Sequence, residues 1–155
     1  MPLISGRHDG RSAIVPVAII DAASYAQHKR LEHPYLANSA RFDALIDTGA
    51  TTTMISSRVV QTLGLRPINR LAYRGLGGST WRAGYLFHLA FFDGVVHLDD
   101  PVADRSNAMN RLRVGTKVIN GGELTEVSFD VLIGMDMIST GTLTISLDGT
   151  FSFAF

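Results

Sequence analysis

The sequence predicts a single domain over residues 1–155 that is mainly β, with one or two short helices. A chain of 155 residues can build one core but is too short for two ordinary domains. Val, Ile, Thr and Phe fill short segments between Gly, Asp and Asn, which favours strands over helices. Apolar side chains at every second position predict one long strand: Trp81, Ala83, Tyr85, Phe87, Leu89 and Phe91.

The composition is typical of a globular protein without a charge bias. Hydrophobic residues make up 46% and charged residues 18%, and 14 basic side chains balance 14 acidic ones. We therefore expect neither nucleic acid nor an anionic membrane as a partner. No apolar run approaches the roughly 18 residues of a membrane-spanning helix, and the first residues are too polar for a secretory signal. A cytoplasmic location is expected, and the absence of cysteine excludes disulfides and thiol chemistry.

The N-terminal part is predicted to hold a strand followed by a polar insertion. Residues 13–20 form the strand, with Pro16 at an edge or a bulge because proline has no N–H to donate to a neighbouring strand. Residues 22–40 are mostly polar and are interpreted as an insertion, with a short helix over 23–31.

A second strand and a short capped helix are predicted next. The strand covers residues 41–49, and residues 50–55 are expected to continue in an extended conformation. Ser56 or Ser57 can cap the following helix, and Gly64 can end it. One face of this helix carries its apolar residues: Val59, Val60 and Leu63.

The rest of the chain is predicted to form hairpins and one buried strand. Glycines at 75–78 suit the tip of a hairpin that leads into the long strand. Residues 98–123 are interpreted as a loop excursion with room for one extra hairpin, and 126–134 as a buried strand. Asp136 is the expected N-cap of a helical turn. A last hairpin turns at 148–149 and places three aromatic residues on one face: Phe151, Phe153 and Phe155.

The stretch FDALIDTGAT at 42–51 places an acid, Asp47, directly after an apolar run. The order of the parts is informative: Asp-Thr-Gly-Ala after a strand, a helix ending in LGL, RGLGG before a long strand, then FDVLIGMDMI and a final hairpin. This order resembles the retroviral-type aspartic proteases (retropepsins), in particular their bacterial and cellular relatives. The resemblance runs from about residue 13 to 155, without the two polar stretches. It implies the closed β-barrel of one lobe of the acid-protease fold.

Aspartic proteolysis requires two carboxylates that share a water molecule and one proton, because like charges so close together cannot both ionise. The chain has a single Asp-Thr-Gly, so the second acid must be Asp47 of another copy, related by a two-fold axis. The resemblance thus implies an aspartic endopeptidase that is active as a homodimer on a protein or peptide substrate. One Asp47 would take a proton from the attacking water, and the other would polarise the scissile carbonyl. No metal or other cofactor is needed.

The resemblance also assigns roles around Asp47. Thr48 would bond to the partner's loop and keep the two aspartates in register, and Gly49 would let backbone N–H groups approach the carboxylate. Leu76 would be the tip of a flap that closes over the substrate. Retroviral enzymes have acids after the alanine, where this chain has three threonines, so their subsite preference does not carry over. The other candidate substrate-binding residues lie on the cleft floor and the flap: Ala50, Thr51, Thr52, Gly75, Gly77 and Gly78.

Several features keep a second interpretation. Asp47 could be an ordinary turn residue, and the glycine-rich stretch an ordinary hairpin turn. Asp136 could be mistaken for a second catalytic acid, and the three C-terminal phenylalanines could lie in the core or at a subunit interface. The histidines and the acidic loop at 99–104 lack the spacing of zinc or calcium sites, so no metal is expected. The alternative function is a catalytically silent or latent module of the same fold that binds peptides or dimerises.

Overall fold

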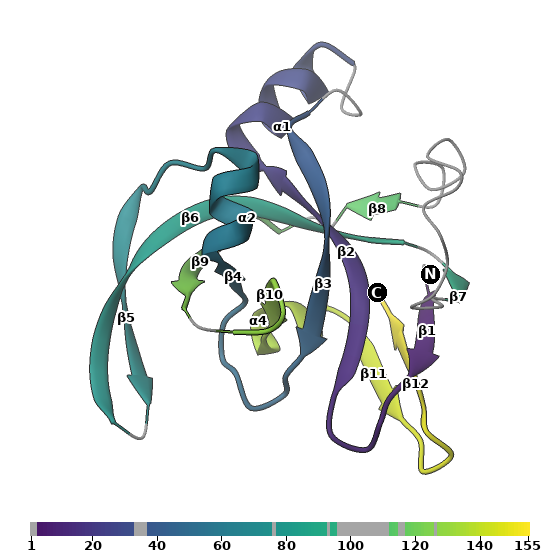
Figure 1. The fold of residues 1–155 in the computed structure, drawn as a ribbon. Coiled ribbons are helices and arrows are strands. Elements are labelled where there is room, and N and C mark those ends of the chain that lie inside the picture. The colour runs from purple at the N-terminus through teal and green to yellow at the C-terminus, as the bar shows by residue number, and fades with distance from the viewer. Residues whose placement is uncertain are drawn as a thin grey trace.

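A closed β-barrel of six strands forms the body of the protein (Figure 1). The computed structural model describes residues 3–32, 37–75, 77–92, 94–95, 112–114, 117–125 and 127–155. The predictions of a mainly β fold and of a closed barrel are confirmed, because the sixth strand pairs back onto the first. In order around the barrel the strands are β2 (Ala13–Asp21), β3 (Ser39–Ile46), β10 (Val131–Ile133), β4 (Met54–Ser56), β9 (Ile119–Leu124) and β6 (Gly78–Phe92).

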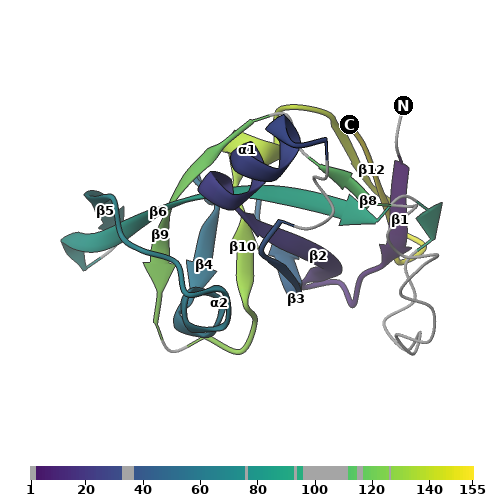
Figure 2. The same cartoon turned by 90° about the horizontal axis from the view of Figure 1, so that it is seen from above.

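Two further strands extend the barrel sheet along β6. Strand β5 (Asn69–Gly75) pairs with the first half of β6, and the two form a hairpin that projects from the barrel (Figures 1 and 2). Strand β8 (Leu112–Val114) pairs with the other end of β6. The core explains only part of the alternating apolar pattern of β6. Four of its six members are buried: Tyr85, Phe87, Leu89 and Phe91. Trp81 is 62% exposed because it lies on the projecting hairpin.

A second, four-stranded sheet contains both ends of the chain. Its order is β11 (Thr142–Ile145), β12 (Thr150–Ala154), β1 (Leu3–Arg7) and β7 (Gly94–Val95). Both views place this sheet on the opposite side of the barrel from the β5–β6 hairpin (Figures 1 and 2). The sequence analysis missed β1, since only Ile4 of this strand is buried and its partner β12 lies at the far end of the chain.

The described residues contain three short helices, and the ends of the helices follow the local sequence. Helix α1 (Ala22–Arg30) is capped by Asp21, whose side chain accepts a hydrogen bond from the Ser24 N–H. Helix α2 (Ser57–Leu63) is capped by Ser56 and ends at Gly64, which is left-handed, as predicted. Helix α4 (Met135–Ile138) follows β10 directly. No helix in the described residues is long and apolar enough to cross a membrane.

Three segments differ from the sequence prediction. The insertion expected at 22–40 ends early, because β3 already begins at Ser39 and pairs with β2 from there. Residues 50–53 turn instead of continuing in an extended conformation. The end of the expected loop excursion is β9, a barrel strand between β4 and β6, while residues 98–111 lie outside the described part of the chain. The buried strand expected over 126–134 is limited to β10.

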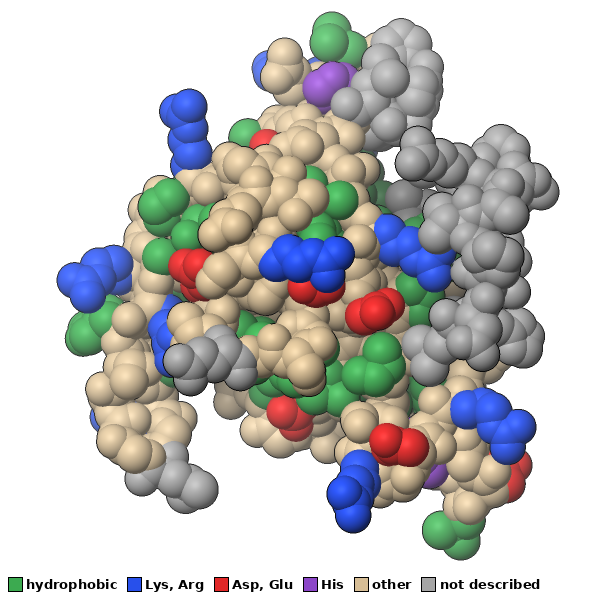
Figure 3. All heavy atoms as spheres, viewed as in Figure 1, with side chains coloured by type: hydrophobic (Ala, Val, Ile, Leu, Met, Phe, Trp, Pro, Cys, Tyr) green, Lys and Arg blue, Asp and Glu red, His purple; other side chains and the backbone are tan. Residues whose placement is uncertain are grey.

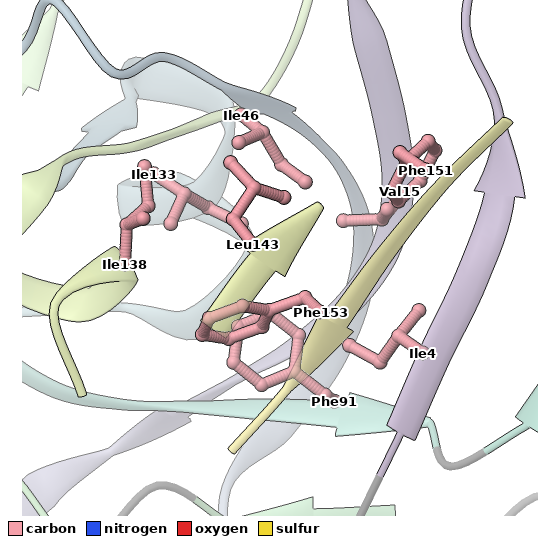
Figure 4. Close-up of a pocket in the computed structure, with 9 residues that line it drawn as sticks. All are labelled: Ile4, Val15, Ile46, Phe91, Ile133, Ile138, Leu143, Phe151 and Phe153. Atoms are coloured by element: carbon pink, nitrogen blue, oxygen red, sulfur yellow. The ribbon is translucent and has the colours of Figure 1, made fainter. Parts of the chain in front are cut away.

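Pro16 fits its strand because β6 pairs with β2 only from Val17 onward, so Pro16 has β3 as its one strand neighbour. The aromatic residues of the last hairpin face inward. Phe151 and Phe153 are 2% and 3% exposed. The Phe153 ring meets the Phe91 ring edge-on, with 5.6 Å between the ring centres, and Phe151 lies beside Val15 (Figure 4). Phe151 and Phe153 surround a void of about 10 Å³ whose lining is entirely apolar, which does not suit a water molecule. These two residues therefore belong to the core of the single chain.

Candidate active site

Asp47 follows β3 and begins a tight loop that is fixed by its own backbone. The N–H of Asp47 donates to the carbonyl of Ile133 over 3.0 Å, which extends the pairing of β3 with β10. The N–H of Gly49 donates to the carboxylate of Asp47 over 2.8 Å, and the N–H of Ala50 donates to the Asp47 carbonyl over 3.2 Å. A Cβ at position 49 would lie 3.2 Å from the same carboxylate oxygen, so glycine permits this close approach. The loop thus holds one oxygen of the carboxylate.

Asp47 is partly exposed in the single chain. Ala44, three residues earlier, is fully buried, so the chain passes from the core to the surface between Ala44 and Asp47. Thr48 and Gly49 beside it are exposed. The loop is therefore fixed on the side that faces the barrel and exposed on the side that faces solvent. Its acid is accessible to a substrate, to water or to another protein.

A buried hydrogen-bond cluster supports this loop. Thr53 is completely buried, and both its N–H and its hydroxyl donate to one oxygen of Asp136, over 2.9 and 2.7 Å. The Thr53 hydroxyl in turn accepts from the N–H of Gly134 over 3.1 Å, and the N–H of Met137 donates to the same Asp136 oxygen. Three donors converge on this oxygen, so Asp136 anchors the loop. The prediction that Asp136 is the N-cap of the helical turn is wrong, because Gly134 occupies that position.

The backbone of residues 50–53 lies directly against the start of α4. The N–H of Met135 donates to the carbonyl of Ala50 over 2.8 Å, and the N–H of Asp136 donates to the carbonyl of Thr51 over 3.1 Å. A Cβ at position 134 would lie 2.5 Å from the carbonyl carbon of Thr52, so only glycine fits here. The carbonyls of Ala50 and Thr51 are thus engaged within the chain. A substrate backbone that binds at these predicted positions would have to use other groups.

The glycine-rich stretch forms the end of the β5–β6 hairpin, as predicted. The two strands pair from Asn69 opposite Gly84 to Gly75 opposite Gly78, and Gly78 has a φ of 107°, a conformation that favours glycine. Leu76, the predicted flap tip, lies outside the described residues. The Tyr73 hydroxyl accepts from the N–H of Gly122 over 2.9 Å and ties the hairpin to β9. This bond lies near the end of the hairpin, because Tyr73 is opposite Thr80 and only two residues before Gly75. The role of the hairpin as a flap stays a prediction.

The β5–β6 hairpin carries charge of one sign. Its two strands contain Arg70, Arg74 and Arg82 and no aspartate or glutamate, although the whole chain has a net charge of zero. Lys and Arg side chains are visible along the projecting hairpin at the left of Figure 3. The Arg70 guanidinium lies 5.8 Å from the centre of the exposed Trp81 ring, and Arg82 donates to the Thr125 hydroxyl over 2.9 Å. An anionic peptide would meet a favourable potential at this hairpin.

Other charged groups lie away from this loop. Burial raises the pKa of Tyr85, whose hydroxyl donates to Glu123 over 3.2 Å between β6 and β9. The hydroxyl and the N–H of Thr150 lower the pKa of Asp148 in the last hairpin. The described residues contain no group of three or more His, Cys, Asp or Glu side chains that could hold a metal ion.

Comparison with known families assigns this architecture. A family model described as aspartyl protease matches residues 34–137, which is more than half of the chain and includes both the Asp47 loop and Asp136. The chain belongs to the aspartyl protease family. The resemblance predicted from the sequence is thereby confirmed at the level of the family. A crystal structure of a retropepsin-like aspartic protease from Rickettsia conorii is similar, with a TM-score of 0.46, 13% identity and 92% coverage of each chain. Comparison with curated proteins gives no match.

In this member of the aspartyl protease family, the sequence analysis singled out the Asp47 loop but missed the residues that support it. Asp47, Thr48 and Gly49 lie together at the end of β3, as predicted. The roles of Thr53 and Asp136 were missed because they are 83 residues apart and meet only in the folded chain. One local signal was present. Gly134, between β10 and α4, marks a close approach of its backbone to the backbone of Thr52.

Proposed function

We propose that this chain is an aspartic endopeptidase in which two copies of Asp47, one from each subunit of a homodimer, activate a water molecule. The observation that carries the proposal is the Asp47 carboxylate itself. It is accessible, it accepts a hydrogen bond from the Gly49 N–H, and its loop is anchored by Asp136, in a chain of the aspartyl protease family. The chain has only one Asp-Thr-Gly, so a symmetric pair needs a second copy.

The chemistry follows from two carboxylates that share one proton. The ionised Asp47 removes a proton from the water as the water oxygen attacks the scissile carbonyl carbon. The protonated Asp47 of the partner subunit donates to the carbonyl oxygen, and a tetrahedral gem-diol forms. Collapse of the gem-diol breaks the C–N bond as a proton passes to the leaving nitrogen. The hydrogen bond from the Gly49 N–H holds one oxygen of the Asp47 carboxylate in place for these steps.

The substrate proposed for this site is an extended stretch of a protein or peptide. Such a chain can be held by backbone hydrogen bonds between the Asp47 loop and the β5–β6 hairpin, which would close over it and exclude water. The glycines at the end of this hairpin and its projection from the barrel support this role (Figure 1). We place the enzyme in the cytoplasm, on the sequence argument given above.

Cleavage of a mixed peptide library between about pH 3 and 7 tests the proposal, since carboxylate pairs work in this range. The decisive variant is Asp47→Asn, which keeps an acceptor for the Gly49 N–H but removes the acid. Asp43→Asn is the matched control, because it makes the same change at an exposed position of β3, four residues before Asp47. We expect cleavage by the wild type and by Asp43→Asn only. Cleavage by Asp47→Asn would refute the proposal, and peptide binding without cleavage by the wild type would favour the silent module.

A further inference from the structure

An open apolar groove lies directly beside the Asp47 loop. It has a volume of about 580 Å³ and contains no charged residue in its lining. Met135 is 39% exposed and Ile145 is 57% exposed, although both are large apolar side chains. Its walls come from the Asp47 loop, α4 and β11, and we call it the β11 groove: Thr48, Met135, Ile138, Ser139, Gly141, Leu143 and Ile145.

The floor of the β11 groove is continuous with the core. Ile138 and Leu143 line the groove on one side and the small apolar void of the barrel on the other (Figure 4). A single layer of side chains therefore separates the interior from solvent. Leaving such a surface uncovered exposes apolar area close to the core, and a second apolar surface would remove it from water.

One edge of β11 is also open. In the described residues the second sheet ends at β11, and β12 is flanked by β11 on one side and β1 on the other. The Ser146 N–H donates to the Thr150 carbonyl, so these two residues form a hydrogen-bonded pair that continues the pairing of β11 with β12. Hydrogen-bonded and non-hydrogen-bonded pairs alternate along two antiparallel strands. By this alternation, Leu143 and Ile145 direct their backbone groups away from β12. An exposed edge of this kind is a template for pairing with another strand.

We propose that a second copy of this chain docks on the β11 groove and the β11 edge, while β1 and β12 stay paired within their own chain. The inference rests on the proposed function, because a shared pair of Asp47 carboxylates requires a two-fold axis next to this loop. Thr48 lies in both the loop and the groove lining, so the axis brings the two grooves against each other. The absence of charge in the lining suits a surface that meets its own copy.

The pairing of the chain ends opposes a dimer built by exchanging them. Strand β1 is in register with β12 over five residue pairs, from Leu3 opposite Ala154 to Arg7 opposite Thr150. Strand β12 also has β11 on its other edge, so neither edge of β12 is free for a partner. An exchange of termini would have to break these pairs first, whereas docking at β11 breaks none.

The first test introduces a charge into the groove. Ile145→Glu is compared with Ile68→Glu, because Ile68 is the same residue type at almost the same exposure, 54%, and lies before β5. Sedimentation over a dilution series gives the dimer dissociation constant of each. We expect Ile145→Glu to weaken dimerisation at least about tenfold, because two carboxylates would meet in an apolar contact, and Ile68→Glu to leave it unchanged. Equal dissociation constants in two folded variants would overturn the proposal.

A second test does not depend on a destabilising change. The chain has no cysteine, so the double variant Ser5→Cys with Ser152→Cys carries only the two thiols that face each other between β1 and β12. Oxidised protein is separated on a denaturing gel without reductant. A monomer band from a sample that was dimeric in solution shows that each β1 pairs with its own β12, as proposed. A covalent dimer that appears at low concentration shows exchanged termini and refutes the arrangement.

The two proposals can fail separately. If the wild type cleaves peptides as a dimer but Ile145→Glu changes neither mass nor rate, the peptidase stands and its interface lies elsewhere. If the wild type dimerises through β11 yet Asp47→Asn has no effect on cleavage, the interface stands and the catalytic proposal falls. A wild-type chain that stays monomeric at every concentration overturns the inference.

Discussion

Asp136 is expected to hold the Asp47 loop together, and its removal gives a quantitative test. In Asp136→Ala, the N–H and the hydroxyl of the fully buried Thr53 both lose their acceptor. A buried donor left without a partner costs about 1–3 kcal/mol, so the loss of two should lower the free energy of unfolding by about 2–6 kcal/mol. In Asp136→Asn an amide oxygen can still accept both bonds, and the loss should be about 1 kcal/mol, because only the charge assistance disappears.

Urea unfolding of the two Asp136 variants, followed by circular dichroism, measures these differences directly. Asp43→Ala is the control, since Asp43 is an exposed aspartate whose side chain can be removed with little effect. A double variant that also carries Thr53→Val should lose less than the sum of the single changes, because both act on one cluster. If Asp136→Ala is as stable as Asp43→Ala, or if the effects of Asp136 and Thr53 simply add, the anchoring role is wrong.

Three further predictions concern other parts of the molecule. Gly134→Ala should destabilise the protein by about 2 kcal/mol or more, because its Cβ would lie 2.5 Å from the loop backbone, whereas Gly77→Ala has open space and should be nearly neutral in the same urea assay. The lowered pKa of Asp148 adds stability that is complete above its ordinary value of 3.8 and is lost as the pH falls through the folded value. Asp148→Asn should therefore flatten the acid limb of the stability curve, and an unchanged limb would argue against the Thr150 contacts as its source. Cleavage sites should be enriched in acidic residues, and both Arg70→Gln and added salt should reduce this enrichment in the library profile.

Local signals in the sequence were sufficient for much of the fold. Ser56 and Gly64 mark the two ends of α2, and the glycines near 75–78 mark the turn of the projecting hairpin. These features are set by neighbouring residues, because capping and turn conformations depend on short-range backbone geometry. The Asp47 loop belongs to this class, since its Gly49 hydrogen bond spans only two residues.

The parts that the sequence did not reveal depend on distant contacts. Strand β1 owes its place to β12, at the opposite end of the chain, and carries a single fully buried residue that could have marked it. Strand β9 reads as a polar, glycine-rich loop because Gly121 and Gly122 leave room for Phe87 and Tyr73 from other strands. Trp81 continues the alternation of β6 beyond the barrel, where no core remains to bury it. The spacing of apolar residues predicts that a segment is a strand, but it does not predict which parts of the strand other elements cover.

The Asp47 loop separates the group that reacts from the groups that hold it. Asp47 is partly exposed and its carboxylate accepts a hydrogen bond from the Gly49 N–H, whereas Thr53 and Asp136 lie behind it in a buried cluster. In the proposed dimer the Asp47 carboxylate meets its symmetry mate and so cannot be buried within one chain, which leaves the folded monomer to fix its position from behind. This division explains why Asp47→Asn is expected to affect cleavage with little loss of stability, while changes at Asp136 act first on the fold. In the proposed dimer a second copy completes this half-site, and the apolar groove beside Thr48 is the surface proposed for that contact.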